Sequence, residues 1–377
     1  MAYGTVNADV IGTSVANTSL GAGNASIMKS RIINGSMVID QRNAGASVTG
    51  NDGVFGVDRF TCQATQTGKF TVQQNAGSVA NGGSVVAPAG FTNWLGVTSS
   101  SAYSVAAGDY FNIVQKIEGF NTADLNWGTA NAKTITISAW VYSSLTGTFG
   151  GVVQNSGYSY CYPFSYSIPV ANTWTQINIT IAGPTAGTWI GATNGIGLRL
   201  AFSLGCGSTY AGTAGAWVAS EKEGVSGATS VVGTSGATFY ITGVQLEVGS
   251  SATGYEYRQY QQELALCQRY AQVFTNPNTQ NVRFAVAGNY SSGSNLGYPA
   301  RFLSTTMRTS PSLTISAVGD FKTQQFDSPT QTVTALNVDN ASTDEIGFSV
   351  TVGSNFSNGM NLLANNGNAK MILSAEL

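Results

Sequence analysis

Apolar and polar residues alternate along many short segments between residues 31 and 258. In the segment 135–142, isoleucine, alanine and valine fall on one face, and threonine, serine, tryptophan and tyrosine fall on the other. The same period of two recurs in the segments 70–72, 111–117, 174–181, 195–204 and 238–248. One apolar face per strand is typical of antiparallel sheets with one buried side. We therefore predict an all-β fold, in which residues 31–258 form a large jelly-roll-like antiparallel β-sandwich.

One segment near residue 260 departs from this period. Leu266, Tyr270, Val273 and Phe274 recur at the spacing i, i+4, i+7 and i+8, which predicts a short amphipathic helix. Pro277 should end it. We assign residues 259–280 as a helical connector. Its apolar stripe could pack on the sandwich or form an oligomer interface.

The ends of the chain differ from the middle. Strand-like segments return at 283–287, 312–318, 332–336, 346–352 and 370–377, separated by long polar loops such as 289–299 and 353–369. They predict a second, smaller β domain over residues 281–377. The first 30 residues are rich in small side chains and carry only Asp9 and Lys29 as charges. We expect residues 1–30 to be an extended arm that becomes ordered against a partner surface.

Charge is sparse throughout the chain. Charged residues make up 9%, the net charge is −2, and histidine is absent. The lack of histidine excludes Ser-His-Asp and Cys-His catalysis and histidine metal ligands. A near-neutral chain has no strong field to attract nucleic acid or an anionic membrane. No apolar stretch is long enough to span a membrane, the N-terminus does not resemble a secretory signal, and we expect neither a metal nor a cofactor.

The state of the four cysteines has two possible interpretations. Cys62, Cys161, Cys206 and Cys267 form no C-x-x-C motif. We favour four buried free thiols over a Cys161–Cys206 bridge between neighbouring strands.

A structural Ca²⁺ site is a further alternative, drawn from Asp52, Asp58 and Glu247. We favour instead that Asp58 pairs with Arg59 or another arginine, and that Glu247 faces solvent beside the turn at Gly249.

The run YSYCYPFSY is the most distinctive candidate site. Five aromatic residues in it share one parity along an extended strand: Tyr158, Tyr160, Tyr162, Phe164 and Tyr166. Such a face could stack on the apolar faces of sugar rings, although we favour a core or interface role. Tyrosine in place of phenylalanine argues for a partly wet face, because a buried hydroxyl needs a partner. Pro163 argues for an edge strand.

Two tryptophans lie in turn-like stretches. Trp94 or Trp127 could be an exposed stacking residue, but a buried tryptophan that anchors a loop is the commoner arrangement. The remaining four lie in or near strands, and we expect them mostly in the core: Trp140, Trp174, Trp189 and Trp217.

Catalytic carboxylates are hard to find. A polysaccharide-cleaving enzyme needs two of them about 5–9.5 Å apart. The nearest acidic pairs in the sequence are Asp52 with Asp58, Glu118 with Asp124, and Glu221 with Glu223. None of these pairs lies in a recognisable motif. Glu221 and Glu223 flank Lys222, which indicates a solvated loop. We therefore expect a protein that is not an enzyme.

Three blocks of sequence carry a resemblance to a known group of proteins. They are KSRIINGSMVIDQRNAGASV (29–48) with VDRF (57–60), WGTANAKTITISAWVYSSLTGTFGG (127–151), and TFYITGVQLEVGSSATGYEYRQYQQELALCQRY (238–270). This combination resembles tailed-bacteriophage virion proteins of the tail fibre, minor tail or receptor-binding type, whose central region is similar to a carbohydrate-binding-module jelly roll. MRTSPSLTI (307–315) resembles the start of the C-terminal β domain in the same group.

The resemblance implies a structural, non-enzymatic protein on the virion surface, often trimeric. We expect the arm, residues 1–30, to bind other virion proteins, and the sandwich to recognise host surface polysaccharide. The candidate contacts are Tyr158, Tyr160, Tyr162, Tyr166, Trp94 and Trp127. The competing hypothesis is a capsid decoration or head-fibre protein with a purely structural role, and a polysaccharide depolymerase is third.

Overall fold

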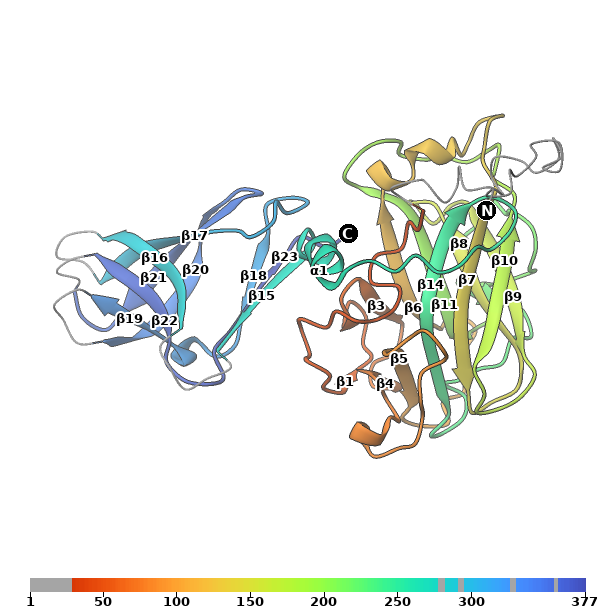
Figure 1. The fold of residues 1–377 in the computed structure, drawn as a ribbon, viewed down its shortest axis with the longest axis horizontal. Helices are drawn as coiled ribbons and strands as arrows, with labels where there is room; N and C mark the ends of the chain where they lie inside the picture. The colour runs from red at the N-terminus through yellow and green to blue at the C-terminus, as the bar shows by residue number, and fades with distance from the viewer. Residues whose placement is uncertain (1–28, 277–281, 291–294, 326–329, 356–358) are drawn as a thin grey trace, which may run out of the picture. The chain divides into compact units, whose positions relative to one another are not determined.

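The computed structural model describes residues 29–276, 282–290, 295–325, 330–355 and 359–377 (Figure 1). Residues 1–28, which make up almost all of the predicted arm, lie outside the described part. The chain divides into two compact units: the first runs to Val38 and resumes over Gly45–Arg258, and the second combines Ile39–Ala44 with Gln259–Leu377. Strands dominate both units, which confirms the all-β prediction.

The first unit is built on two six-stranded sheets. In spatial order, the first sheet contains β1 (Val48–Thr49), β4 (Phe70–Gln74), β5 (Leu95–Ser99), β14 (Thr238–Val248), β7 (Ile135–Ser143) and β10 (Thr175–Ile181). The second contains β2 (Phe55–Val57), β3 (Phe60–Ala64), β6 (Tyr110–Glu118), β11 (Ile196–Cys206), β8 (Gly147–Gln154) and β9 (Cys161–Ile168). Ladder pairs are antiparallel in both sheets, as expected for a jelly-roll-like sandwich.

The alternating apolar residues predicted from the sequence form the core between these sheets. Register pairs Ile137 of β7 with Ile179 of β10, and Ala139 with Ile177, so the apolar faces of the two strands coincide. In β11 the leucine and phenylalanine positions are buried in the same cluster, while Arg199 alternates onto the outer face of the sheet. The period of two therefore assigned the buried face of these strands correctly.

Residues 207–225 pass over the outer edge of the second sheet. Within this segment, β12 (Ala211–Gly212) pairs with β13 (Gly224–Val225). The N–H of Gly215 donates to the Pro163 carbonyl (2.9 Å), and Val218 forms an isolated bridge with Cys161. Since β9 ends the sheet order, the prediction of an edge strand from Pro163 is confirmed.

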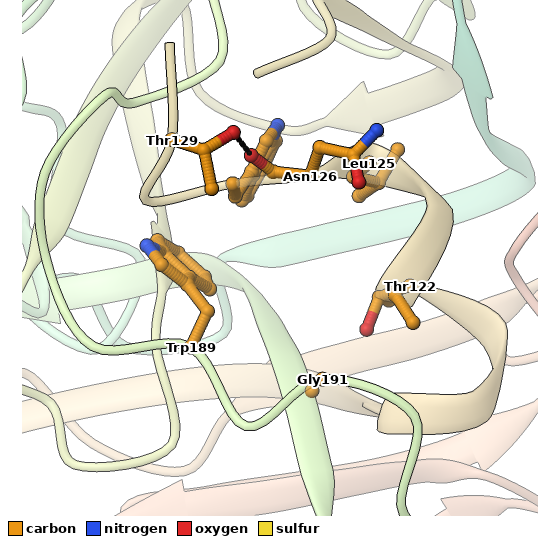
Figure 2. A pocket seen from close by; sticks show the side chains of 9 residues that line it. Thr122, Leu125, Asn126, Thr129, Trp189 and Gly191 are labelled. Atoms are coloured by element: carbon orange, nitrogen blue, oxygen red, sulfur yellow. Dashed lines mark hydrogen bonds between the residues drawn. The ribbon is translucent and has the colours of Figure 1, made fainter. Parts of the chain in front are cut away.

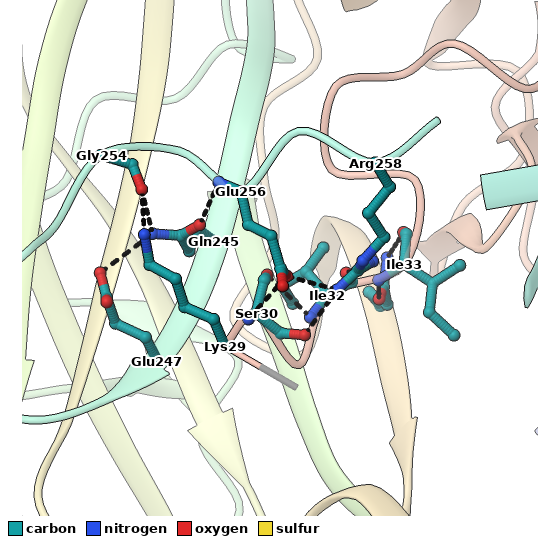
Figure 3. A network of polar contacts seen from close by, with 10 residues as sticks. Lys29, Ser30, Ile32, Ile33, Gln245, Glu247, Gly254, Glu256 and Arg258 are labelled. Carbon is teal, nitrogen blue, oxygen red and sulfur yellow. Dashed lines mark hydrogen bonds and ion pairs between the residues drawn. The ribbon is translucent and has the colours of Figure 1, made fainter. Parts of the chain in front are cut away.

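A polar network holds the beginning of the described chain to the first unit (Figure 3). The Ser30 N–H donates to the Glu256 carboxylate (3.0 Å), and Arg258 donates to both the Ser30 carbonyl and Glu256 (2.8 Å each). On the other side, the Gln115 amide exchanges two hydrogen bonds of 2.8 Å with the Ile33 backbone. The first and third sequence blocks of the resemblance therefore meet in space.

The second unit contains a closed barrel. Its strands, in order, are β16 (Arg283–Tyr290), β17 (Leu296–Phe302), β21 (Glu345–Val352), β20 (Gln331–Ala341), β19 (Phe321–Gln325) and β22 (Met360–Ala364). A three-stranded sheet adds β15 (Ala271–Thr275), β23 (Lys370–Ser374) and β18 (Ser312–Ile315). Strand β22 lies within a segment that we predicted to be a loop, and β17 begins within another. Glycine and asparagine obscured their pattern, and barrel closure supplies partners that the local sequence does not reveal.

The amphipathic helix is shorter than predicted. Helix α1 spans Tyr260–Gln268, and β15 begins at Ala271, so Val273 and Phe274 lie in a strand. Pairing with β23 decided this, because apolar residues at 270–274 also suit a strand and tertiary pairing overrides helix propensity. Tyr270 is fully buried, and Leu266 is half-buried. The predicted stripe is therefore not a continuous helix face, and Tyr270 is not available as an interface residue.

In the described part of the chain, no helix has the length and apolar character needed to traverse a lipid bilayer.

Candidate functional site

A pocket of about 190 Å³ lies at one end of the sandwich. One wall comes from Thr122, the short 3-10 turn Ala123–Leu125 and the residues that follow. The facing wall comes from the loop after β10, which carries Trp189. Figure 2 shows Trp189 across the pocket from Asn126 and Thr129. The pocket is smaller than the roughly 300 Å³ that begins the usual range for drug-sized ligands.

The two walls differ in chemistry. Trp189 is half-buried, packs edge-on against Trp127 at 4.8 Å, and donates its Nε1–H to the Ala186 carbonyl (3.2 Å). Asn126 adopts a left-handed conformation (φ 52°) that turns the chain, and its side chain is exposed. The exposed Thr129 hydroxyl donates to the Asn126 carbonyl (2.7 Å). An aromatic wall faced by an amide and hydroxyls suits a small ligand with one flat apolar face and polar edges.

A cluster of aromatic rings supports the pocket from behind. Trp217 lies at its centre, with ring centroids 5.4 Å from Trp127, 5.9 Å from Trp189 and 5.3 Å from Tyr162. Its ring also stacks on Tyr160 at 5.6 Å, with 11° between the planes. Three predicted candidates, Trp127, Tyr160 and Tyr162, therefore come together here.

Trp189 and Trp217 were expected in the core and were not among the candidate contacts; both pack against the core cluster at its edge. Both are half-buried and lie outside the named strands, so no period marks them. The backbone at Gly187 also packs closely against the Tyr160 ring of this cluster. A Cβ added to Gly187 would lie 2.9 Å from the Tyr160 ring, so only glycine permits this contact.

The prediction that five aromatic residues share one strand face is wrong. Strand β9 begins at Cys161, so Tyr158 (φ 56°) and Tyr160 precede it in a turn. Phe164 and Tyr166 point into the sandwich core, where Tyr166 is only 7% exposed and its hydroxyl lacks a hydrogen-bond partner. Tyr166 therefore cannot contact a ligand.

The two candidate tryptophans in turn-like stretches are both buried. Trp94 is 3% exposed and donates its Nε1–H to the Ala76 carbonyl (2.9 Å), which excludes it as an exposed stacking residue. Trp127 is 7% exposed, but it still borders the pocket beside Trp189.

Tyr158 borders a second pocket, of about 200 Å³, on the outer face of the second sheet. Its other walls include Asp52, Gln63 and Lys116. The Arg199 guanidinium lies 5.4 Å from the centroid of the Tyr158 ring. Tyr158 is thus separate from the other predicted aromatic contacts.

A buried ion pair lies beside this second pocket. Arg199 and Glu223 are 2.8 Å apart, with side-chain exposures of 1% and 0%. Arg199 also donates to Gln154 and Gln63, and Asn112 donates to Glu223 (2.6 Å). Burial raises the pKa of Glu223, and the charge of Arg199 opposes that rise.

The expectation that Glu223 lies in a solvated loop is therefore wrong. Strand β13 begins at the next residue and packs against the second sheet, where Val225 lies close to Gly150. Its neighbour Glu221 is exposed, so the two acids of this pair occupy different environments.

The residues considered for calcium do not gather. Within the described ranges, no group of three or more His, Cys, Asp or Glu side chains is placed to hold a metal ion. Glu247 is 4% exposed and accepts hydrogen bonds from the N–H and hydroxyl of Thr253 (2.8 and 2.6 Å), so the expectation that it faces solvent is wrong. Asp58 is also buried, whereas Asp52 is exposed.

All four cysteines are free thiols. Cys161 and Cys206 therefore form no bridge with each other. Cys206 is partly exposed, and the other three are buried.

Comparison with known proteins gives similarities of structure alone. No protein-family model and no curated protein sequence matches the chain. A domain of tailspike protein 4 of bacteriophage CBA120 matches with 13% identity and a TM-score of 0.29, over 54% of this chain and 22% of the tailspike domain. The family 11 carbohydrate-binding module of Clostridium thermocellum matches with 12% identity and a TM-score of 0.25, over 55% and 98% of the two chains.

The N-terminal cellulose-binding domain of Cellulomonas fimi β-1,4-glucanase C matches with 15% identity and a TM-score of 0.23. The match covers 42% of this chain and 80% of that domain. This chain spans about a fifth of the tailspike domain. The residues of the pocket, rather than these matches, carry the argument that follows.

Proposed function

We propose that the protein is a non-enzymatic glycan-binding protein of a phage virion surface, and that the pocket beside Trp189 is its glycan site. One observation carries the proposal: a half-buried indole faces exposed Asn126 and Thr129 across a pocket of about 190 Å³. A sugar ring presents an apolar C–H face to an aromatic ring and hydroxyls to amide and hydroxyl groups. The small volume favours a single sugar unit, such as a chain end.

The virion role rests on the sequence resemblance. Blocks 29–48 and 238–270 resemble tail fibre and receptor-binding proteins, and these blocks meet in the network around Arg258. On this proposal, residues 1–30 dock the protein to other virion proteins, and the displayed form is a homotrimer. Several copies would multiply a weak affinity for host polysaccharide.

The test is binding of the purified full chain to oligosaccharides released from the host surface, measured by calorimetry. Trp189→Ala should lower the affinity at least about tenfold, which corresponds to about 1.4 kcal/mol. Trp140→Ala is the matched control, because Trp140 is also half-buried but lies on β7 and does not border the pocket. It should leave the affinity unchanged.

A second variant separates binding from folding. Asn126→Asp keeps the shape of the side chain and tolerates the left-handed backbone, but removes the amide donor. It should weaken binding without lowering the melting temperature. If the protein binds no host glycan, or if Trp189→Ala and Trp140→Ala bind equally, the glycan site is wrong. Antibody labelling confined to phage heads, together with no glycan binding, would support the capsid-decoration hypothesis instead.

A further inference from the structure

In the closed barrel of the second unit, the ladder between β16 and β17 ends at the pair Val286 and Ala300, before either strand ends. Beyond this pair, the end of β17 remains paired with β21 on its other side. The start of β16 remains paired with β22. A cavity of about 420 Å³ occupies this region. Arg283 and Val286 of β16 face Arg301 and Phe302 of β17 across it.

Arg301 is held in place at the cavity. Its guanidinium carbon lies 3.8 Å from the centroid of the Phe274 ring, and its Nη1 donates to the Phe284 carbonyl of β16 (2.8 Å). The side chain is half-buried, and burial lowers its pKa. Stacking on a ring and bonding to a carbonyl fix the direction of the planar guanidinium.

Among the residues that the structure describes, neither Arg283 nor Arg301 forms an ion pair. A partly desolvated cation without an anion is unfavourable, so an anion that enters the cavity would be stabilised by it. Arg283 is exposed and free to close on such a ligand.

An apolar platform lies beside the two cations. Phe302 is 80% exposed and Val286 is 50% exposed, although large apolar side chains are usually buried. Glu345 lies opposite Phe302 in the ladder and borders the same cavity. Its carboxylate can accept hydrogen bonds from hydroxyl groups.

We propose that this cavity binds an acidic saccharide unit of the hexuronate or sialate class. The sugar carboxylate pairs with Arg301 and Arg283, the apolar face of the ring contacts Phe302, and a hydroxyl donates to Glu345. A singly charged carboxylate suits the site better than a phosphate, because Glu345 repels a dianion more strongly. The proposal adds a site in the second unit and does not depend on the pocket at Trp189.

The test is a titration of the full chain with galacturonate and trigalacturonate, against galactose and galactotriose as neutral partners of the same shape. Saturation-transfer NMR and calorimetry report the binding. The acidic sugars should bind at least about tenfold more tightly than the neutral ones, and high salt should weaken the binding of the acidic sugars. Arg283→Gln and Phe302→Ser should each lower the affinity for the acid by about tenfold.

Two control variants should leave this binding unchanged. Lys322→Gln removes a positive charge elsewhere in the barrel, and Trp189→Ala alters the first pocket. Arg283 and Phe302 are exposed, so their substitution should not unfold the barrel, and unchanged melting temperatures would verify this.

Equal binding of galactose and galacturonate would overturn the proposal. So would galacturonate binding that Arg283→Gln leaves intact, or inorganic phosphate that competes more strongly than galacturonate. These failures would leave the Trp189 site untouched, and loss of glycan binding in Trp189→Ala would not affect the barrel cavity.

Discussion

Two aromatic clusters in the first unit have similar ring packing and different surroundings. In the first, which we name the closed cluster, Trp94, Tyr142, Trp174 and Tyr240 lie on the outer side of the sheet that contains β7 and β14. Tyr142 stacks on Tyr240 at 5.1 Å with 8° between the planes. The second, the open cluster, consists of the rings around Trp217 and includes a comparable stack, at 5.6 Å and 11°.

The difference lies in the loops. Over the closed cluster, the indole of Trp94 donates to the Ala76 carbonyl and that of Trp174 to the Val86 carbonyl (2.9 and 2.8 Å), so the segment between Ala76 and Trp94 folds against the rings. In the open cluster, the indole of Trp189 is satisfied within its own loop and leaves a cavity in front of it. Aromatic residues alone therefore do not define a binding site. The path of the neighbouring backbone decides whether a ring is a structural anchor or a contact surface.

The largest effect should come from the closed cluster. Trp94→Ala removes a ring that is 97% buried by area, since 3% is exposed, and should destabilise the protein by about 3–5 kcal/mol. Urea denaturation followed by circular dichroism measures this. A loss below about 1 kcal/mol would show that the loop over this cluster does not depend on Trp94, and the contrast with the open cluster would fail.

Trp217→Ala should have an intermediate effect, of about 2 kcal/mol. Trp217 is half-buried, but it contacts four other rings and donates to the Ala182 carbonyl (2.8 Å). The same denaturation experiment measures the stability, and glycan titration measures the site. Full glycan affinity in a destabilised Trp217→Ala protein would contradict its role as the support of Trp189.

Tyr166→Phe should be neutral or should stabilise the protein by up to about 1 kcal/mol. The Tyr166 hydroxyl is buried without a hydrogen-bond partner, so its removal relieves a desolvation penalty. A rise or no change in the denaturation midpoint is expected. A clear loss of stability or of glycan binding would mean that the hydroxyl has a partner and that Tyr166 belongs with the site.

The smallest loss of stability should come from Trp189→Ala, at less than about 0.5 kcal/mol, because Trp189 lies on a loop at the surface of the open cluster. The comparison with Trp94→Ala is the sharpest test of the contrast. A Trp189→Ala loss as large as that of Trp94→Ala would make both clusters structural.

The buried faces of several strands could be predicted from the sequence, but their neighbours could not. Alternation correctly assigned the inward residues of β7, β10 and β11. It misjudged residues 270–274, because one short apolar run satisfies a helix and a strand equally well. Only pairing with β23 distinguishes the two.

The site was only partly predictable for a related reason. Trp127, Tyr160 and Tyr162 were among the candidates, whereas Trp189 was assigned to the core. Glu223 was expected in solvent because charged residues flank it closely in sequence. Its buried partner, Arg199, is 24 positions away, on β11.

The sequence by itself determined that this chain builds antiparallel layers and has few charged side chains. Side-chain direction alternates with every residue of a strand, so a local pattern is sufficient to choose the buried face. The tertiary structure alone decided which aromatic rings meet, which loop covers them, and which arginine forms an ion pair. Those outcomes depend on contacts between residues far apart in the chain, and the local pattern carries no information about backbone paths over such separations.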